Sequence, residues 1–327
     1  MKKLLLASTA LVAFAGAAAA EVALSGSAEM GVIGGDNVET QFHTHVDVTF
    51  TLSGETDGGI SFGASVDLDE AVKITSSNSD PVAIFISGDF GTLTMGDTDG
   101  ALDWALTEAS VGNAGSITDD ETGHAGFLGS YLDGAYDGQI LRYDYSFGDF
   151  AAAFSVELDD AVVARDEGFA IGARYRFNFG GGSVNIGAGY QVATVQAGYL
   201  PGNMDVAFIG AYGADTEITA IGVSAAVSLD SGLQASLSYT DFDESATGGF
   251  YHLGLSAGYT FDAITVSANY GMYEGDNAAL WDVVGYGFAA AYDLGGGLSA
   301  HFGYGYSDYF SGADTFNTWS LGLAMSF

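Results

Sequence analysis

The most constraining feature of this sequence is an alternation of apolar and polar residues with a period of two, repeated along many short segments. In residues 318–327 every second residue is apolar: Trp319, Leu321, Leu323, Met325 and Phe327. Residues 297–308 follow the same pattern. Successive side chains of a β-strand point to opposite faces, so this alternation is typical of strands with one apolar and one polar face. We therefore expect an all-β protein.

Sixteen segments of this kind follow residue 20. The expected strands are residues 21–33, 38–53, 59–69, 81–88, 91–97, 138–148, 149–158, 167–179, 182–193, 216–229, 232–242, 249–261, 263–273, 281–294, 297–308 and 316–327. Short turns such as 180–181 alternate with longer connections such as 274–280, and residues 194–215 are expected as a long apolar loop without an evident role. No later stretch has the roughly 18 apolar residues of a transmembrane helix. An even strand count with alternating turn lengths predicts a transmembrane antiparallel β-barrel.

The first 20 residues have the features of a secretory signal peptide. Lys2 and Lys3 precede an apolar stretch over residues 4–17, and the small residues 18–20 follow it. Small residues at this place are typical of a cleavage site, here before Glu21. The alternative is a membrane anchor, but the apolar stretch is short and no basic stop-transfer segment follows. We expect residues 1–20 to be removed and residues 21–327 to form one barrel domain.

The charge and composition of the chain exclude several classes of function. It has 42 acidic and 7 basic residues, a net charge of −35 and no cysteine. So few cations cannot neutralise a nucleic-acid backbone, and a chain without cysteine has no disulfide, thiol nucleophile or thiolate metal site. The sequence contains no phosphate-binding loop, nucleophile elbow or zinc-protease motif, and no arrangement of Ser, His and acid stands out. We therefore expect neither nucleic-acid binding nor enzymatic activity.

A secreted soluble β-sandwich or β-solenoid is the alternative fold, since such proteins are also rich in short strands and glycine. Expected strands of about 10–13 residues are long for a sandwich but suit strands tilted across a membrane. A calcium-binding solenoid would need a repeated nine-residue Gly and Asp pattern, which the 49 glycines of this chain do not keep. The pattern therefore favours the barrel.

Four stretches carry a resemblance to a known family. They are EVALSGSAEMGVIGG at 21–35, GDTDGALDWALTEASVGNAGSITDDETGHAGF at 96–127, YDGQILRYDYSFGDF at 136–150 and WSLGLAMSF at 319–327. Together they resemble Rhodobacter-like alphaproteobacterial general-diffusion porins, over nearly all of the chain after residue 20. The resemblance implies a homotrimer of sixteen-stranded barrels in the outer membrane of a Gram-negative bacterium, in contact with its lipid and lipopolysaccharide. Phe327 at the C-terminus is shared by many outer-membrane barrels as a barrel-closing signal.

The same resemblance implies the function of the chain. It is that of a passive, water-filled channel for small hydrophilic solutes and ions, with no required cofactor. Pores of this family are narrowed by a long third outer loop folded inward, which corresponds here to residues 98–137. A solute-specific channel is the alternative, and it would need an aromatic or hydrogen-bonding track along the lumen. The inward positions are mostly Ser, Thr, Gly, Asn and acids, which favours general diffusion.

Lumen-facing positions can be assigned from the phase of the alternation. On the expected strands 138–148 and 167–179 the polar phase contains Arg142, Arg174 and Arg176, and Arg165 lies just before the second of them. We expect the loop to face these arginines with its carboxylates: Asp97, Asp99, Asp103, Glu108, Asp119, Asp120 and Glu121. Opposite charges across a narrow lumen orient polar solutes and hinder apolar ones. The alternative role of the arginines is structural, holding the loop in place by pairing with it.

The excess of acidic residues has three further interpretations, of which the simplest is a solvated or salt-adapted acidic surface. The excess also predicts a channel that prefers cations. Carboxylates at 119–121 and 241–244 could instead bind calcium, although neither group has the spacing of a defined calcium loop. A secreted calcium-binding β protein is therefore the alternative from another functional class. His43, His45 and Asp47 share one strand face, but a transition metal there would need a further ligand from a neighbouring strand.

Overall fold

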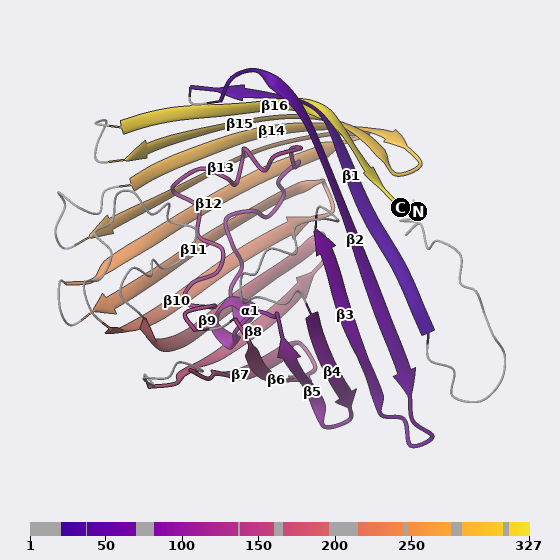
Figure 1. Cartoon of the computed structure of the whole chain (residues 1–327), viewed down its shortest axis with the longest axis vertical. Coiled ribbons are helices and arrows are strands. Elements are labelled where there is room, and N and C mark those ends of the chain that lie inside the picture. Colours follow the sequence, from indigo (N-terminus) through magenta and orange to yellow (C-terminus); the bar gives the residue numbers. More distant parts are fainter. Residues whose placement is uncertain are drawn as a thin grey trace.

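The computed structural model describes residues 21–36, 38–69, 82–136, 138–159, 166–195, 215–244, 248–275, 283–309 and 314–327. Within these residues it contains sixteen strands and one short helix (Figure 1). The elements are β1 (Glu21–Gly35), β2 (Gln41–Glu55), β3 (Ser61–Asp69), β4 (Val82–Gly88), β5 (Gly91–Gly96), α1 (Ala101–Ala105), β6 (Ile140–Phe147), β7 (Phe150–Glu157), β8 (Gly168–Phe179), β9 (Gly182–Val195), β10 (Thr216–Leu229), β11 (Leu233–Glu244), β12 (Phe250–Phe261), β13 (Ile264–Gly275), β14 (Val283–Gly295), β15 (Leu298–Tyr309) and β16 (Asp314–Ser326). The expected signal peptide, Arg165 and most of the expected loop at 194–215 lie outside the described residues.

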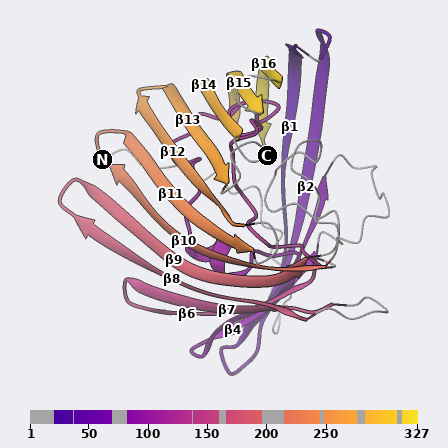
Figure 2. The ribbon, with the colours of Figure 1, turned by 90° about the vertical axis from the view of Figure 1, so that its left-hand side faces the viewer.

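The strands form one closed ring. Each strand pairs antiparallel with its sequence neighbours, and β1 closes the ring by pairing with β16, where Ser27 lies opposite Ser326. Figure 2 shows strands lying obliquely side by side along the wall. The prediction of a sixteen-stranded antiparallel barrel is confirmed. Predicted bounds differ by a few residues: β16 begins at Asp314, because its pairing with Tyr309 of β15 continues past the alternating segment.

Short turns join the strands at one end of the barrel, and longer connections join them at the other. Several short turns contain a residue with positive φ, such as Gly148 (67°) between β6 and β7 and Gly181 (120°) between β8 and β9. Glycine adopts this backbone conformation without the steric penalty of a side chain. At the opposite end, the connection between β5 and β6 spans residues 97–139 and contains α1.

The two faces of the barrel wall differ in chemistry. Large apolar side chains such as Ile171, Phe177 and Phe288 are exposed on the outside. Polar side chains alternate with them and point inward, where Ser224 and Asn269 are buried. A closed ring with an apolar outer belt suits a hydrocarbon environment, because the strands satisfy one another's backbone groups.

Among the described residues, no helix has the length and apolar character needed to cross a membrane.

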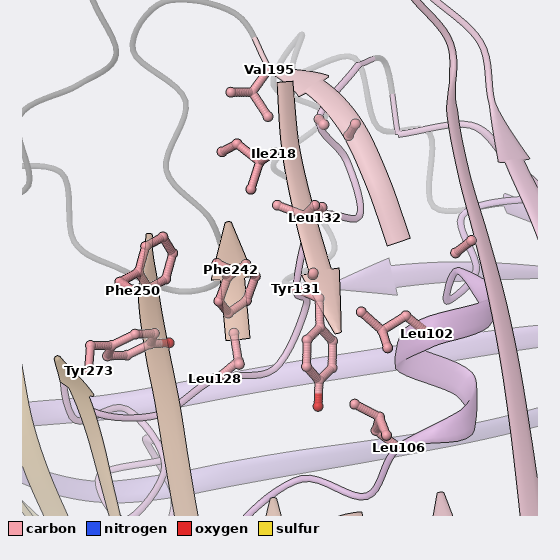
Figure 3. Close-up of a cluster of buried hydrophobic side chains, with 14 of the residues drawn as sticks. Leu102, Leu106, Leu128, Tyr131, Leu132, Val195, Ile218, Phe242, Phe250 and Tyr273 are labelled. Carbon is pink, nitrogen blue, oxygen red and sulfur yellow. The ribbon is translucent and has the colours of Figure 1, made fainter. Parts of the chain in front are cut away.

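A buried apolar cluster lies inside the ring. It joins residues of the β5–β6 connection with inward side chains near the long-connection ends of the strands: Leu102, Leu128, Tyr131, Leu132, Val195, Ile218, Phe242, Phe250 and Tyr273. Figure 3 shows Tyr131 between Leu102 and Leu128. The rings of Phe242 and Phe250 stack with their centroids 4.6 Å apart. Burial of these side chains removes apolar area from water, and so stabilises the connection in its place inside the barrel.

Candidate functional site

We call the connection between β5 and β6, residues 97–139, the inner segment. Its Asp137 is not among the described residues. Figure 1 shows the inner segment in magenta inside the ring. Inward serines of the wall bond its irregular backbone. The N–H groups of Ala101 and Thr107 each donate to a serine Oγ at 2.8 Å, on Ser155 of β7 and Ser224 of β10. Further serines bond later backbone groups at 2.8 to 3.0 Å: Ser236, Ser256, Ser267 and Ser307. These bonds satisfy backbone groups that have no strand partner.

Inward glycines let the inner segment lie directly against the wall. A Cβ atom on Gly258 of β12 would overlap the carbonyl oxygen of Gly112, and one on Gly271 of β13 would overlap that of Gly126. Any other residue at these positions would push the two backbones apart. A Cβ atom would also crowd backbone or side-chain atoms of the inner segment at further inward glycines: Gly172, Gly187, Gly222, Gly254, Gly285, Gly287, Gly303 and Gly305. Part of the high glycine content therefore serves to seat this segment.

Two buried histidines bond the returning limb of the inner segment to β12 and β13. His124 Nε2 lies 3.2 Å from Asn269 Oδ1, and His252 Nε2 lies 2.9 Å from the carbonyl oxygen of Gly126. Burial lowers the pKa of His124 to about 4, because the charged imidazole would lose its hydration there. His124 is therefore neutral at pH 7, and its bond to Asn269 joins two uncharged groups.

The sequence-predicted arginines lie where α1 meets β6 and β8. Arg142 of β6 donates from Nη1 to the carbonyl oxygen of Asp99 at 2.7 Å and pairs with Asp144 at 3.4 Å. Arg174 of β8 donates to the carbonyl oxygen of Trp104 at 3.2 Å, and its guanidinium lies 3.8 Å from the Trp104 ring centroid. These two arginines contact the inner segment through backbone carbonyls and an aromatic ring, where the sequence indicated carboxylates.

Arg176 belongs to the same wall, and Trp104 of α1 lies against it. Arg176 donates to Asn178 Oδ1 at 3.3 Å and to Ser183 Oγ at 3.4 Å. Trp104 also lies near Arg142, with 5.9 Å between the guanidinium carbon and the ring centroid. Sequence analysis missed Trp104, because the inner segment has no periodicity that assigns a direction to its side chains. The available signal was a large aromatic residue within an acidic stretch.

The carboxyl groups nearest this wall have raised pKa values. Burial raises the pKa of Asp103 to about 9 and that of Glu108 to about 7, and the neighbouring Asp99 adds to both rises. Asp133, which the sequence analysis did not single out, accepts the N–H of Gly100 at 2.6 Å, and burial raises its pKa to about 6. At pH 7 Asp103 is therefore mainly protonated, and Glu108 is near its midpoint.

The carboxylates at 119–121 lie apart from the arginines. Asp120 packs against Gly305 of β15 and Glu121 against Gly287 of β14. These strands are on the other side of the ring from β6 and β8. Burial raises the pKa values of Asp119 and Glu121. Because the inner segment passes from one side of the lumen to the other, its acidic residues do not form a single row.

Two further acidic side chains lie on the strands β1 and β3. Glu29 of β1 is opposite His45 of β2, and Glu29 Oε2 lies 3.8 Å from His45 Nδ1. Asp119 lies near His45. The positive charge of the His45 imidazole lowers the pKa of Asp119 and so partly offsets the rise that burial causes. Burial raises the pKa of Asp97, and the nearby carboxylates of Asp99 and of Asp67 in β3 raise it further. Sequence analysis did not name Glu29 or Asp67, although the alternation assigns both to a polar face.

The metal hypotheses gain no support from the geometry of the described residues. Within these residues, no group of three or more His, Cys, Asp and Glu side chains is placed to hold a metal ion. Asp241 and Asp243 line a small cavity together with Glu274, whose carboxylate accepts the hydroxyl of Tyr251 at 2.5 Å.

Known proteins of similar sequence and structure include several porins. The family model described as Gram-negative porin matches residues 7–311. A porin of Rhodobacter capsulatus is 34% identical over 296 residues, which cover 85% of this chain and 92% of that protein. A porin structure refined at 1.8 Å superimposes with a TM-score of 0.71 and 28% identity, covering 94% of this chain and 100% of that one. OmpT of Vibrio cholerae, in a variant without loop L8, shares the fold at 13% identity, with a TM-score of 0.65 and coverage of 94% and 99%. With its closed, polar-lined barrel of sixteen strands, the chain belongs to the Gram-negative porins, the passive channels of the outer membrane.

Proposed function

We propose that this porin is a general-diffusion channel that prefers cations and selects small hydrophilic solutes by size and charge, without a catalytic step. The observation that carries the proposal is the excess of carboxylates along the lumen: Glu29, Asp67, Asp97, Asp99 and Asp119, against Arg142, Arg174 and Arg176. Fixed negative charge in a narrow channel with low-dielectric walls attracts cations and repels anions. A preference for cations is the expected consequence.

We infer that residues 98–137 narrow the pore against a charged wall. The basic side comprises Arg142, Arg174 and Arg176, together with Arg165, which lies outside the described residues. Of the seven sequence-predicted carboxyl groups, Asp119, Asp120 and Glu121 face this side from across the ring, and Asp97, Asp99, Asp103 and Glu108 belong to the earlier part of the loop. The contacts of Arg142 and Arg174 with the inner-segment backbone support this assignment. The strands that carry Glu29 and His45, near Asp119, lie across the ring from β8. Opposite charge on two sides of a lumen orders water, which an apolar solute must displace at a cost in free energy.

The arginines hold the inner segment and filter solutes at the same time. Hydrogen bonds to the carbonyl oxygens of Asp99 and Trp104 use only some of the five N–H donors of each guanidinium. In Arg174 the positive charge remains, because a carbonyl oxygen carries no formal charge to neutralise it, whereas Arg142 is also paired with Asp144 at 3.4 Å. The structural and the electrostatic role are therefore compatible above all in Arg174.

The assembly proposed for this channel is a homotrimer in contact with lipid and lipopolysaccharide. Family membership and the exposed apolar belt support it. Export by a cleaved signal peptide at residues 1–20 agrees with the charge and hydropathy of that segment. A barrel-closing role for Phe327 is supported by its N–H, which donates to the carbonyl oxygen of Gly26 in β1 at 2.9 Å. We include no calcium site in the proposal, because the acidic groups in the described residues lack a metal-ligand arrangement.

The test is the reversal potential of charge variants in planar bilayers across a potassium chloride gradient. The double variant Glu29→Gln/Asp119→Asn loses two lumen carboxylates, and we expect a smaller cation preference. Arg174→Ser/Arg176→Ser loses two positive charges, and we expect a larger one. Glu274→Gln changes a carboxylate at the long-connection end of β13 and is the matched control. Equal reversal potentials in all four proteins would contradict the proposed electrostatic filter.

A further inference from the structure

A cavity of about 450 Å³ opens beside the inner segment, on the side of the short turns. Its walls come from the residues after α1, the β6–β7 turn, and β8 and β9. Its polar lining is formed by Thr107, Ser146, Asp149, Arg174, Arg176 and Asn185. The cavity therefore combines two guanidinium groups with hydroxyl and amide groups that can donate hydrogen bonds.

Both arginines of this cavity are held in place by neutral groups. Arg174 stacks on Trp104 and donates to its carbonyl oxygen. Arg176 donates to Asn178 and Ser183. In the part of the chain that the structure describes, neither guanidinium has a carboxylate oxygen within 4.0 Å. Each side chain is therefore oriented in advance and keeps N–H donors for another acceptor.

The absence of an ion pair at these two guanidinium groups contrasts with the composition of the protein. The chain carries 42 acidic residues, yet Asp149 is the sole carboxylate among the described residues that line the cavity. Two arginines and one aspartate leave a local charge of about +1. Arg174 and Arg176 are two positions apart on one strand face, about 6.6 Å at the spacing of a β-strand. Long side chains at this spacing can converge on one small anion.

We propose that this cavity binds a phosphate group, as inorganic phosphate or as the phosphate ester of a small hydrophilic solute. The planar fork of a guanidinium matches the oxygens of a phosphate, and the two negative charges of the group favour a site with two arginines. Thr107, Ser146 and Asn185 line the same cavity and carry hydroxyl or amide groups that can donate to the remaining oxygens. The site retains phosphate-bearing solutes beside the narrowed part of a lumen that otherwise repels anions. This goes beyond the proposed ion preference and adds a solute-binding step to it.

The experiment measures single-channel current at pH 7.5 and constant ionic strength while inorganic phosphate replaces chloride. The expected result is a saturable fall in current, and glucose 6-phosphate is expected to give the same effect. Arg176→Ser and Arg174→Ser should each raise the half-blocking phosphate concentration about tenfold, as expected for loss of a charge-assisted hydrogen bond. Asp149→Asn removes the one repelling carboxylate and should lower that concentration. Titration calorimetry of the detergent-solubilised protein with inorganic phosphate checks the same ranking at equilibrium.

Three results would overturn the inference. The first is current that depends on ionic strength alone, with no saturable effect of phosphate. The second is equal block in the wild type and in the two arginine variants, each shown to be folded by heat-modifiable migration in SDS gels. The third is equally strong block by citrate, which would mean a site for carboxylates in general. A channel that keeps its cation preference but ignores phosphate would disprove this site alone and leave the proposed function intact.

Discussion

At the scale of single residues, Trp104 links the inner segment to the basic wall. Its ring lies 3.8 Å from the guanidinium of Arg174, and its carbonyl oxygen accepts a bond from the same group. A cation over an aromatic face gains about 0.5 to 2 kcal/mol, depending on exposure. The position of Arg174 in the lumen therefore depends on a residue of the inner segment as much as on its own strand.

Trp104→Ala should release Arg174 and loosen the contact between α1 and the wall. We expect an altered single-channel conductance and noisier open-channel current, because the guanidinium loses a fixed position. Trp104→Phe keeps an aromatic face and should retain most of the wild-type behaviour. Bilayer recordings of the two variants check this. Indistinguishable traces from Trp104→Ala and the wild type would show that the stacking does not position Arg174.

Asp103 and Glu108 predict a pH dependence of selectivity. Burial raises their pKa values to about 9 and about 7, so both carboxyl groups are mainly neutral at pH 6 and mainly charged above pH 9. Raising the pH through this range adds negative charge beside the lumen and should increase the preference for cations. The folded protein holds these protons more tightly than the unfolded chain, so docking of the inner segment should weaken over the same range.

Reversal potentials at pH 6, 7.5 and 9 measure this effect. The double variant Asp103→Asn/Glu108→Gln should show a smaller change between pH 6 and pH 9 than the wild type. His124 is not expected to contribute in this range, because burial keeps its pKa near 4. A cation preference that falls as the pH rises would be the opposite of the expected result.

At the scale of elements, the inner segment is seated by the strands around it. Serines bond its backbone and inward glycines give it room, so the wall specifies its path as much as its own sequence does. The apolar cluster around Tyr131 adds burial at the long-connection end of the barrel. The inner segment has no repeating pattern of apolar residues, and contacts from many strands hold it in place.

Gly258→Val should displace the inner segment, because a side chain there would overlap the carbonyl of Gly112. We expect an altered conductance and a loss of stability of about 1 to 3 kcal/mol, as in other overpacked sites. Gly180→Ala is the control, since an added Cβ at this turn meets nothing within 4 Å. Conductance and urea unfolding of both variants are the measurements. Two variants with equal behaviour would refute close seating at Gly258.

The strands could be predicted from the sequence, but the path of the inner segment could not. Alternation assigns both a strand and a direction to residues such as Arg142 and Arg174, because one face must be apolar. Residues 97–139 have no such period, so nothing local placed Asp119 near His45 or Trp104 against Arg174. The wall determines this path through glycines and serines that recur at inward positions. Their small side chains leave room for the inner segment.

At the scale of the whole molecule, the barrel separates two environments. Its outer surface is an apolar belt, and its interior is lined by polar and acidic side chains. The large negative net charge of the chain is therefore compatible with a lipid environment, because charged side chains face water in the lumen and at the barrel ends.

Ile171→Arg tests the outer face. Ile171 is an exposed residue of β8, and its neighbours in sequence, Ala170 and Gly172, are buried against the interior. A charge on the lipid side of a barrel strand costs about 2 to 4 kcal/mol near the middle of the membrane. Equilibrium unfolding of the vesicle-inserted protein should show a loss of this size, and Ile171→Val should lose much less. An unchanged stability in Ile171→Arg would place this face in water.

The most direct measurement is the current through the refolded wild-type protein, residues 21–327, in a planar bilayer across a salt gradient. We predict large, ohmic steps that close in thirds, with a reversal potential on the side of cation preference. Small currents that one neutral sugar blocks would contradict general diffusion, and a reversal potential on the anion side would contradict the acidic filter.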